Sequence, residues 1–511
     1  MDLLNQFLPR SDFSSYDDFC KGFELNFPDD FNFAYDVVDF YAVHSPEQRA
    51  LVWCNDLGQS KEFTFKQISD LSFIAAAFLK EQGIGPKDVV ILSLHRHYEY
   101  WIFLLALHRL GAVAFPLSSQ LTQDEVLSRK EYCKAKLVIT FEYLNEKWQA
   151  YYKSHSSCLP QISRPKLMLT DPMLLYFTSG TQGEAKAVLH NWLYPLAHII
   201  TAKYWQKNLE GGLHYTMAET GWAKASWGKI YGQWICGSAV FVYDRKSFNP
   251  QSILQKICDY KVTTFCAPPV IYRYLIELDF SKYDLSALTH CCSAGEALDP
   301  HLAQAFFEKT GLHIYEGYGQ TETALLCANF DFKDTEIRPG SFGRPSPLYK
   351  LSLNKNEIVL ALSNNLIPGL FTNYPDSAVT QGFYQTGDLA QTDAQGYFYF
   401  TGRKDAIIKS AGFRISPFEV ENVLNRHKAV LEAYVYGKTD FKRGQIVVAS
   451  VILRKGFSPD KKMEQQLLDY LRENLALYKC PRKIEFVKSL PKTYNGKIKR
   501  GGHNKSEEDS I

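Results

Sequence analysis

A short run of glycine, serine and threonine at residues 176–186 has the composition of an anion-binding loop. It reads YFTSGTQGEAK and ends in a lysine. Glycines let a backbone turn tightly and approach a ligand, while N–H groups, hydroxyls and an ammonium group together bind an anion such as a nucleotide phosphate. The spacing differs from the Walker pattern, and an ordinary turn is the alternative. The candidate phosphate-binding residues are Thr178, Ser179, Gly180, Thr181, Gln182, Gly183 and Lys186.

Two further polar runs follow apolar, strand-like stretches. Residues 293–297 read SAGEA where a wound sheet would open its ligand crevice, with a plain strand-to-helix turn as the alternative. Residues 315–323 read YEGYGQTET. There, Tyr318 offers a flat face to a purine and Thr321 offers a hydroxyl to a phosphate. Glu322 offers an oxygen ligand to Mg²⁺, which is usually bound through few carboxylates.

The last two runs carry an aspartate, an arginine and a lysine. Asp388, in the run YQTGD, suits the two hydroxyls of a ribose, and Arg403 follows fifteen residues later. A hairpin turn at Gly387 and a plain surface charge at Arg403 are the alternatives. Residues 490–497 read LPKTYNGK, and their last residue, Lys497, is either catalytic or simply solvated.

The elements that must position these runs alternate between strand and helix from residue 89 to residue 320. Such alternation predicts largely parallel sheets covered by helices. Asn249-Pro250 and Asp299-Pro300 each place a capping residue before a proline, which predicts two helix starts. The predicted strands are 89–94, 112–115, 137–140, 239–243, 262–267 and 289–293, with a helix at 98–110.

The pattern changes after Gly402. Residues 416–419, SPFE, are typical of a capping box at a helix start. Strands at 433–436, 445–453 and 483–487, together with an amphipathic helix marked by Leu467 and Leu471, complete a small α+β unit. We therefore predict an α/β protein with a large N-terminal domain of helix-covered sheets, residues 1–403, and a small mobile domain, residues 404–511.

Composition excludes several functions. The 511 residues carry a net charge of +2, which indicates neither a nucleic-acid partner nor a membrane-surface partner. The most apolar helix is too short to span a bilayer. Eleven cysteines without metal-ligand spacing indicate buried reduced thiols, and residues 1–6 resemble neither a secretory signal nor a transit peptide. We expect a cytoplasmic protein, monomeric or homodimeric.

Taken in order, the five runs resemble the adenylate-forming superfamily of acyl-CoA synthetases, peptide-synthetase adenylation domains and luciferases. The resemblance covers about residues 35–500 and is strongest to medium-chain acyl-CoA synthetases, through residues 219–224 (ETGWAK), 267–273 (APPVIYR) and 481–487 (PRKIEFV). It implies the adenylate-forming enzyme fold. It also implies a two-step reaction, in which ATP and a carboxylic acid give acyl-AMP and pyrophosphate, and coenzyme A then gives acyl-CoA and AMP.

The resemblance also implies roles. The loop 178–186 would hold the β- and γ-phosphates, Glu322 would bind Mg²⁺, and Lys186, Thr321, Glu322 and Lys497 would be catalytic. The remaining ATP-binding residues would be Gly295, Glu296, Ala297, Glu316, Gly317, Tyr318, Gly319, Gln320, Asp388 and Arg403. Asp405 would be the hinge of the small domain. Coenzyme A would meet Ala411, Gly412, Phe413, Arg414, Arg443 and Arg472.

Two departures from the family pattern concern activity. The phosphate loop reads TQGEA where relatives have a second threonine and a proline before the lysine. Gln182 can still hydrogen-bond a phosphate, Glu184 adds a negative charge, and Ala185 in place of the proline lowers the stiffness of the loop. The segment at Asn356 is also shorter than in relatives.

The acid is predicted from one glycine. Gly319 stands where acetate-specific relatives carry tryptophan, so a medium-chain acid is favoured. Trp222 is a candidate pocket wall, with an ordinary core tryptophan as the alternative. Butyrate-sized and aryl acids remain alternatives, as do a ligase that loads a carrier-protein pantetheine and a catalytically silent nucleotide-binding protein.

Overall fold

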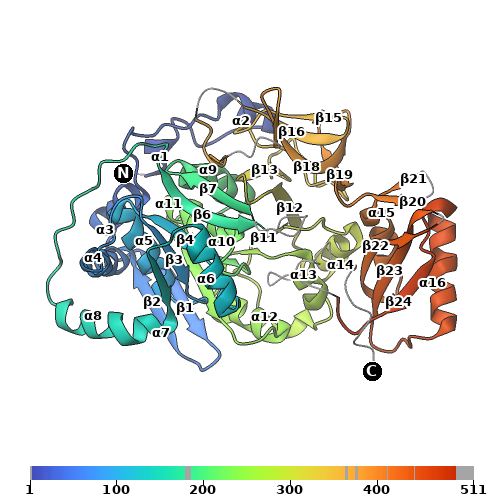
Figure 1. The fold of residues 1–511 in the computed structure, drawn as a ribbon, viewed down its shortest axis with the longest axis horizontal. Coiled ribbons are helices and arrows are strands. Elements are labelled where there is room, and N and C mark those ends of the chain that lie inside the picture. Colours follow the sequence, from blue (N-terminus) through green and yellow to red (C-terminus); the bar gives the residue numbers. More distant parts are fainter. Residues whose placement is uncertain are drawn as a thin grey trace. The chain divides into compact units, whose positions relative to one another are not determined.

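The chain divides into two compact units. The computed structural model describes residues 3–178, 186–362, 366–373, 378–410, 413–441 and 443–490, and the side chain of Arg414 lies outside that description. The first unit contains residues 3–178, 186–350 and 366–373, and the second contains 351–362 and the described residues from 378 onward (Figure 1). Residues 351–362 and 378–403 thus group with the second unit. The predicted boundary at 403 and the hinge at Asp405 stay predictions.

A nine-stranded sheet forms one half of the first unit. Five of its neighbouring pairs are parallel, as the alternating sequence pattern predicts. Antiparallel pairs occur only toward its two edges. In spatial order the strands are β14 (Arg344–Pro345), β13 (Leu325–Ala328), β12 (Ile314–Gly319), β11 (His290–Ala294), β10 (Thr264–Cys266), β8 (Leu213–Thr216), β9 (Ala239–Asp244), β1 (Arg49–Asn55) and β2 (Ser60–Thr64).

A five-stranded sheet forms the other half of the first unit. Its strands are, in order, β5 (Leu137–Thr140), β3 (Val89–Ser93), β4 (Val113–Pro116), β6 (Pro172–Thr178) and β7 (Lys186–Asn191). The first four are parallel to their neighbours, and β7 is antiparallel to β6 at the sheet edge.

Helices cover these sheets, and capping residues in the local sequence mark where two of them begin. The predicted cap Asn249 accepts hydrogen bonds from Gln251 N and Ser252 N at 2.9 and 3.2 Å, and Asp299 accepts from His301 N at 2.9 Å. The helices are α1 (Leu4–Phe7), α2 (Tyr16–Gly22), α3 (Asp39–His44), α4 (Phe65–Glu81), α5 (Glu99–Leu110), α6 (Gln123–Tyr132), α7 (Phe141–Tyr143), α8 (Gln149–His155), α9 (Tyr194–Ile199), α10 (Ala223–Gly228), α11 (Tyr231–Ile235), α12 (Pro250–Asp259), α13 (Pro269–Leu275) and α14 (Pro300–Thr310).

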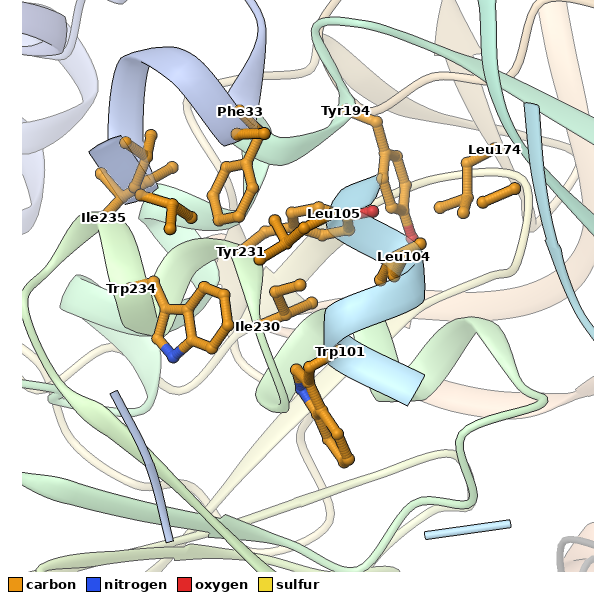
Figure 2. Close-up of a cluster of buried hydrophobic side chains, with 14 of the residues drawn as sticks. Phe33, Trp101, Leu104, Leu105, Leu174, Tyr194, Ile230, Tyr231, Trp234 and Ile235 are labelled. Atoms are coloured by element: carbon orange, nitrogen blue, oxygen red, sulfur yellow. The ribbon is translucent and has the colours of Figure 1, made fainter. Parts of the chain in front are cut away.

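Helix α5 lies at the centre of the largest core. All of its residues are buried, including the polar Glu99, His108 and Arg109, and the buried Arg109 pairs with Asp39 at 2.6 Å. Figure 2 shows side chains of α5, α9 and α11 packed against Phe33 and Leu174. The rings of Phe33 and Tyr231 meet edge to face, with 4.9 Å between their centroids. This core holds α9 beside the edge strand β7, where the rings of Tyr194 and His190 lie 4.0 Å apart.

The second unit contains two smaller sheets and two helices. One sheet has the order β15 (Leu351–Asn354), β16 (Glu357–Ala361), β18 (Phe383–Thr392) and β17 (Val379–Thr380), with β19 (Phe398–Arg403) paired to β18. The other has the order β21 (Phe413–Ile415), β20 (Ile408–Ser410), β23 (Gly444–Leu453) and β22 (Val430–Asp440), with β24 (Lys483–Phe486) paired to β23. Its core includes one face each of α15 (Pro417–Asn425) and α16 (Lys461–Asn474).

Three details correct or refine the sequence predictions. The capping box at residues 416–419 is wrong, because Ser416 Oγ donates to the carbonyl of Thr401 at 2.6 Å and Glu419 pairs with Lys479. All eleven cysteines are free, but Cys20 and Cys158 are exposed rather than buried. Among the described residues, none of the helices has the length and apolar character that a bilayer crossing demands.

Candidate active site

The carboxyl ends of parallel strands gather the candidate residues of the first unit. Strands β8, β10, β11 and β12 run in parallel, so the loops that follow them lie along one edge of the sheet, where wound sheets bind ligands. The second sheet adjoins this edge. Thr220 Oγ1, after β8, donates to the carbonyl of His95, after β3, at 2.8 Å. Tyr176 of β6 lies 2.5 Å from Ser226 of α10, measured between hydroxyl oxygens.

The run 295–297 lies beside the run 316–321. Strands β11 and β12 pair so that Ala294 lies opposite Gly317. Glu316 Oε1 accepts the N–H of Leu298 at 3.0 Å, which ties the loop after β11 to β12. Burial raises the pKa of the Glu316 carboxyl to about 8, so it is mostly protonated at neutral pH. Gly295 has φ of 101°, which a glycine adopts without strain.

Tyr318, which is predicted to cover the purine, lies next to a tightly packed glycine. The Tyr318 ring packs against Phe342, with centroids 4.8 Å apart. A Cβ on Gly317 would lie 2.6 Å from the Trp205 ring, so the missing side chain is needed for internal packing. Packing against Trp205 therefore explains why residue 317 is a glycine, without reference to a nucleotide.

The predicted phosphate loop closes the β6–β7 hairpin. Thr178, the last residue of β6, pairs with Lys186, the first residue of β7, and Lys186 is exposed. Residues 179–185 lie outside the described part, which includes the predicted contacts Ser179, Gly180, Thr181, Gln182 and Gly183. The two ends of the loop are thus fixed by strand pairing.

Strand β7 is bonded to the Thr321–Glu322 run across more than a hundred residues of sequence. His190 Nε2 donates to the carbonyl of Thr321 at 2.8 Å. The carbonyl of Glu322 accepts from Phe371 N at 2.9 Å, and Thr372 N donates to the carbonyl of Leu189 at 2.8 Å. These bonds place the exit strand of the phosphate loop against the candidate α-phosphate and metal residues.

Glu322 is a candidate ligand for a magnesium ion that would enter the site bound to the phosphates of ATP. The described residues hold no cluster of three or more His, Cys, Asp or Glu side chains suited to a metal ion. Mg²⁺ often takes one or two protein carboxylates and completes its shell with phosphates and water. The half-buried Glu322 can supply that single carboxylate.

The acyl-pocket prediction is altered by a tryptophan that sequence analysis missed. A Cβ on Gly319 would overlap the ring of Trp227 and the carbonyl of Ala324. Trp227 is buried on α10, five residues after the half-buried Trp222, and Lys224 on the same helix donates to the carbonyl of Ala294. Gly319 therefore gives its space to Trp227. The repeat of tryptophan after Trp222 was the available signal.

The second unit joins the predicted ribose residues to the predicted hinge. Asp388 on β18 lies opposite Arg403 on β19, and Arg403 Nη1 donates to Asp388 Oδ1 at 2.9 Å. Arg403 Nε also donates to Asp405 Oδ1 at 3.2 Å. Both carboxylates raise the pKa of the Arg403 guanidinium, although burial opposes them as the largest single influence. Because β18 continues through Asp388, the hairpin-turn alternative at Gly387 is wrong.

The predicted coenzyme A residues fall into two groups. Ser410 pairs with Gly444, so Arg443 lies next to the strand that leads into residues 411–414. Phe413 stacks on Tyr478, with centroids 4.4 Å apart. Arg472 instead pairs with Asp469, one turn earlier on α16, at 2.7 Å. Ala411, Gly412, the Arg414 side chain and Lys497 lie outside the described part.

Comparisons with known proteins cover both units. A family model described as "AMP-binding enzyme" matches residues 39–357, and one described as "AMP-binding enzyme C-terminal domain" matches residues 419–497. The chain is 34% identical to human "Acyl-coenzyme A synthetase ACSM3, mitochondrial", over 99% of this chain and 95% of that protein.

Solved structures agree with the fold. The anthranilate CoA ligase AuaEII in complex with anthranoyl-AMP is 27% identical, with a TM-score of 0.79, over 92% of this chain and 96% of that chain. The acyl-CoA synthetase of Brucella canis is 26% identical, with a TM-score of 0.73, over 96% and 98% of the two chains.

Proposed function

Because the chain belongs to the AMP-binding enzyme family, we propose that it is an AMP-forming acyl-CoA synthetase acting on a medium-chain carboxylic acid. The observation that carries this proposal is the hydrogen bond between His190, on the exit strand of the phosphate loop, and Thr321. Two of the five runs, far apart in sequence, are thereby joined in one unit. The match over 99% of the chain to a protein named an acyl-coenzyme A synthetase supports the same chemistry.

In the first step, a carboxylate oxygen of the acid attacks the α-phosphorus of ATP, and pyrophosphate leaves. Loop 178–186 would hold the departing phosphates, Thr321 would contact the α-phosphate, and Tyr318 would cover the adenine. Mg²⁺ held by Glu322 would neutralise phosphate charge. The protein would act mainly by orientation and electrostatic stabilisation, which suits phosphoryl-type transfers.

In the second step, the thiolate of coenzyme A attacks the acyl carbon, and AMP leaves with the bridging oxygen. Among the described residues, the candidates for contacts with coenzyme A are Phe413 and Arg443. Asp388 and Arg403 would bind the ribose in both steps, and Lys497 would stabilise charge in the first. A movement of the small domain about Asp405 between the steps is part of the proposal and follows a common gating pattern.

The medium-chain proposal rests on the resemblance to medium-chain acyl-CoA synthetases and no longer on open space at Gly319. Trp227 fills the volume beside that glycine, so the indole rather than residue 319 would limit the acyl chain. Each methylene buried contributes about 0.8 kcal/mol, so selectivity would be graded along a chain-length series. Short-chain and aryl acids are the competing substrates.

An acid-dependent exchange of pyrophosphate into ATP tests the proposal. Purified protein with ATP, Mg²⁺ and acids of two to twelve carbons should exchange label only when an acid is present. Mass measurement of the product with coenzyme A, or with a holo carrier protein, separates the two acceptors. Absence of acid-dependent exchange would leave a silent nucleotide-binding protein.

A cytoplasmic location is also a proposal. It is based on the free cysteines, whereas the human relative carries "mitochondrial" in its name. Fractionation of cells that express the tagged chain, with a mitochondrial marker followed in parallel, tests it.

A further inference from the structure

The loop that joins β12 to β13 carries Thr321 and Glu322 outside both strands. Its half-buried and buried backbone groups need partners, because an unpaired buried amide or carbonyl is costly. Ala324 N donates to Tyr349 Oη at 3.2 Å, and the carbonyl of Glu322 accepts from Phe371 N at 2.9 Å. The carbonyl of Thr321 accepts from the imidazole of His190. A single histidine side chain thus holds the residue predicted to contact the α-phosphate.

His190 is built to hold one fixed hydrogen bond. The ring is fully buried, and burial lowers its pKa to about 4, so the imidazole is neutral at physiological pH. A carbonyl accepts only from an N–H, so Nε2 carries the proton, and Nδ1 has no hydrogen-bond partner among the described residues. The Tyr194 ring, at the edge of the core in Figure 2, packs 4.0 Å from the imidazole centroid and fixes its plane.

Strand β7 connects this bond to the phosphate loop. One face of the strand carries the side chains of Lys186, Val188 and His190, because successive side chains of a strand point to opposite faces. The side chains of Lys186 and His190 therefore point the same way, and their positions on the strand are about 13 Å apart. Lys186 is fixed by pairing with Thr178. A second link runs from Leu189 through Thr372 and Phe371 to Glu322. The loop 320–324 is therefore bonded to the same strand that carries Lys186, the lysine predicted to bind phosphate.

We propose that His190 is a positioning residue for adenylate formation, which holds Thr321 and Glu322 in register with Lys186. The inference rests on the proposed function and adds a residue that never touches substrate. Loss of the bond would let the Thr321 carbonyl seek another donor and would displace the loop. A misplacement of about 1 Å at a reacting centre can cost on the order of 10²-fold in rate.

The position of the donor gives a sharp test. His190→Leu keeps the bulk and removes the donor, while His190→Gln keeps an amide N–H near the place of Nε2. His190→Asn keeps a polar group but leaves its N–H near the place of Nδ1, short of the carbonyl. His108→Leu is the matched control, because His108 is equally buried, on α5, and its Nε2 lies 3.4 Å from the hydroxyl of Tyr231 on α11.

The readouts are kcat and KM for the acid and for ATP in pyrophosphate exchange, with the thermal midpoint of each variant. We expect kcat to fall ten- to a hundredfold in His190→Leu and His190→Asn, with KM for the acid unchanged and most of the rate restored in His190→Gln. His108→Leu should lose thermal stability and keep its kcat.

The inference is overturned if His190→Leu keeps the wild-type kcat, if His108→Leu loses as much, or if His190→Gln is as slow as His190→Asn. Should His190→Leu fail to fold, the comparison of Gln with Asn decides alone. An inactive wild-type protein would instead reject the proposed function, so the two failures are distinguishable.

Discussion

The indole of Trp227 occupies the volume that a side chain on Gly319 would need. Trp227 belongs to α10 and Gly319 to β12. A Cβ at 319 would also overlap the carbonyl of Ala324, so two separate contacts exclude a side chain there. In the proposed acyl pocket, the limit on acid size would thus be shared by a glycine and a tryptophan that lie ninety-two residues apart in sequence.

Shortening this tryptophan should lengthen the preferred acid. In Trp227→Leu, longer acids should gain kcat/KM relative to shorter ones, by up to about fourfold for each methylene newly buried. A ranked series of acids from C2 to C12 measures this. Trp148→Leu is the control for loss of a buried tryptophan, since Trp148 packs on Phe78 and Phe103. An unchanged ranking in Trp227→Leu would remove Trp227 from the acyl pocket.

Loss of the Asp388 carboxylate should weaken ATP binding. Asp388→Asn keeps the shape but removes the charge that faces Arg403. A hydrogen bond to a charged group contributes about 1.5–3 kcal/mol, so we expect KM for ATP to rise roughly ten- to a hundredfold. Asp393→Asn, at the turn between the same two strands, is the control. Equal KM values for wild type and Asp388→Asn would contradict the ribose role.

Removal of Lys497 should separate the two half-reactions. The residue lies outside the described part, so this prediction comes from the sequence resemblance. Loss of one transition-state contact typically costs about 2.7–4 kcal/mol, or 10²–10³ in rate. Lys497→Ala should lose pyrophosphate exchange by that factor and still form thioester from supplied acyl-AMP, while Lys492→Ala keeps both. Equal loss of both activities in Lys497→Ala would refute the assigned role.

Glu316 should make folding stability depend on pH. Burial raises the pKa of its carboxyl from the ordinary 4.5 to about 8. Between those values the folded chain keeps a proton that the unfolded chain has lost, so the free energy of unfolding falls as pH rises from about 4.5 to about 8. The total change is on the order of a few kcal/mol. Urea unfolding at pH 5, 7 and 9 should show this decline in wild type but not in Glu316→Gln. If the free energies of unfolding of the two proteins change in parallel with pH, the contribution of Glu316 is excluded.

Local sequence signals predicted much of the framework. Asn249 and Asp299 cap the helices that their prolines indicate, and the β-rich runs between residues 89 and 293 form parallel strands, because capping and hydrophobic patterning act over a few residues. Ser416 shows the limit of this reasoning. Its capping motif is present, but its hydroxyl bonds to the distant Thr401 instead.

The missed residues act through contacts that no local pattern encodes. His190 bonds to a carbonyl 131 residues away, and Trp227 fills the space beside Gly319. Each reads locally as an ordinary core residue of a strand or helix. Gly317 shows the converse, since its place in the nucleotide motif is also explained by Trp205 packing beneath it.

The path of a labelled oxygen tests the central claim most directly. An acid carrying ¹⁸O in both carboxyl oxygens would be incubated with the protein, ATP, Mg²⁺ and coenzyme A, and the nucleotide product would be weighed. If the carboxylate attacks the α-phosphorus and the thiol then cleaves the acyl–oxygen bond, AMP gains one ¹⁸O atom for each acyl-CoA formed. Unlabelled AMP, or ADP with the label in inorganic phosphate, would contradict the acyl-adenylate account.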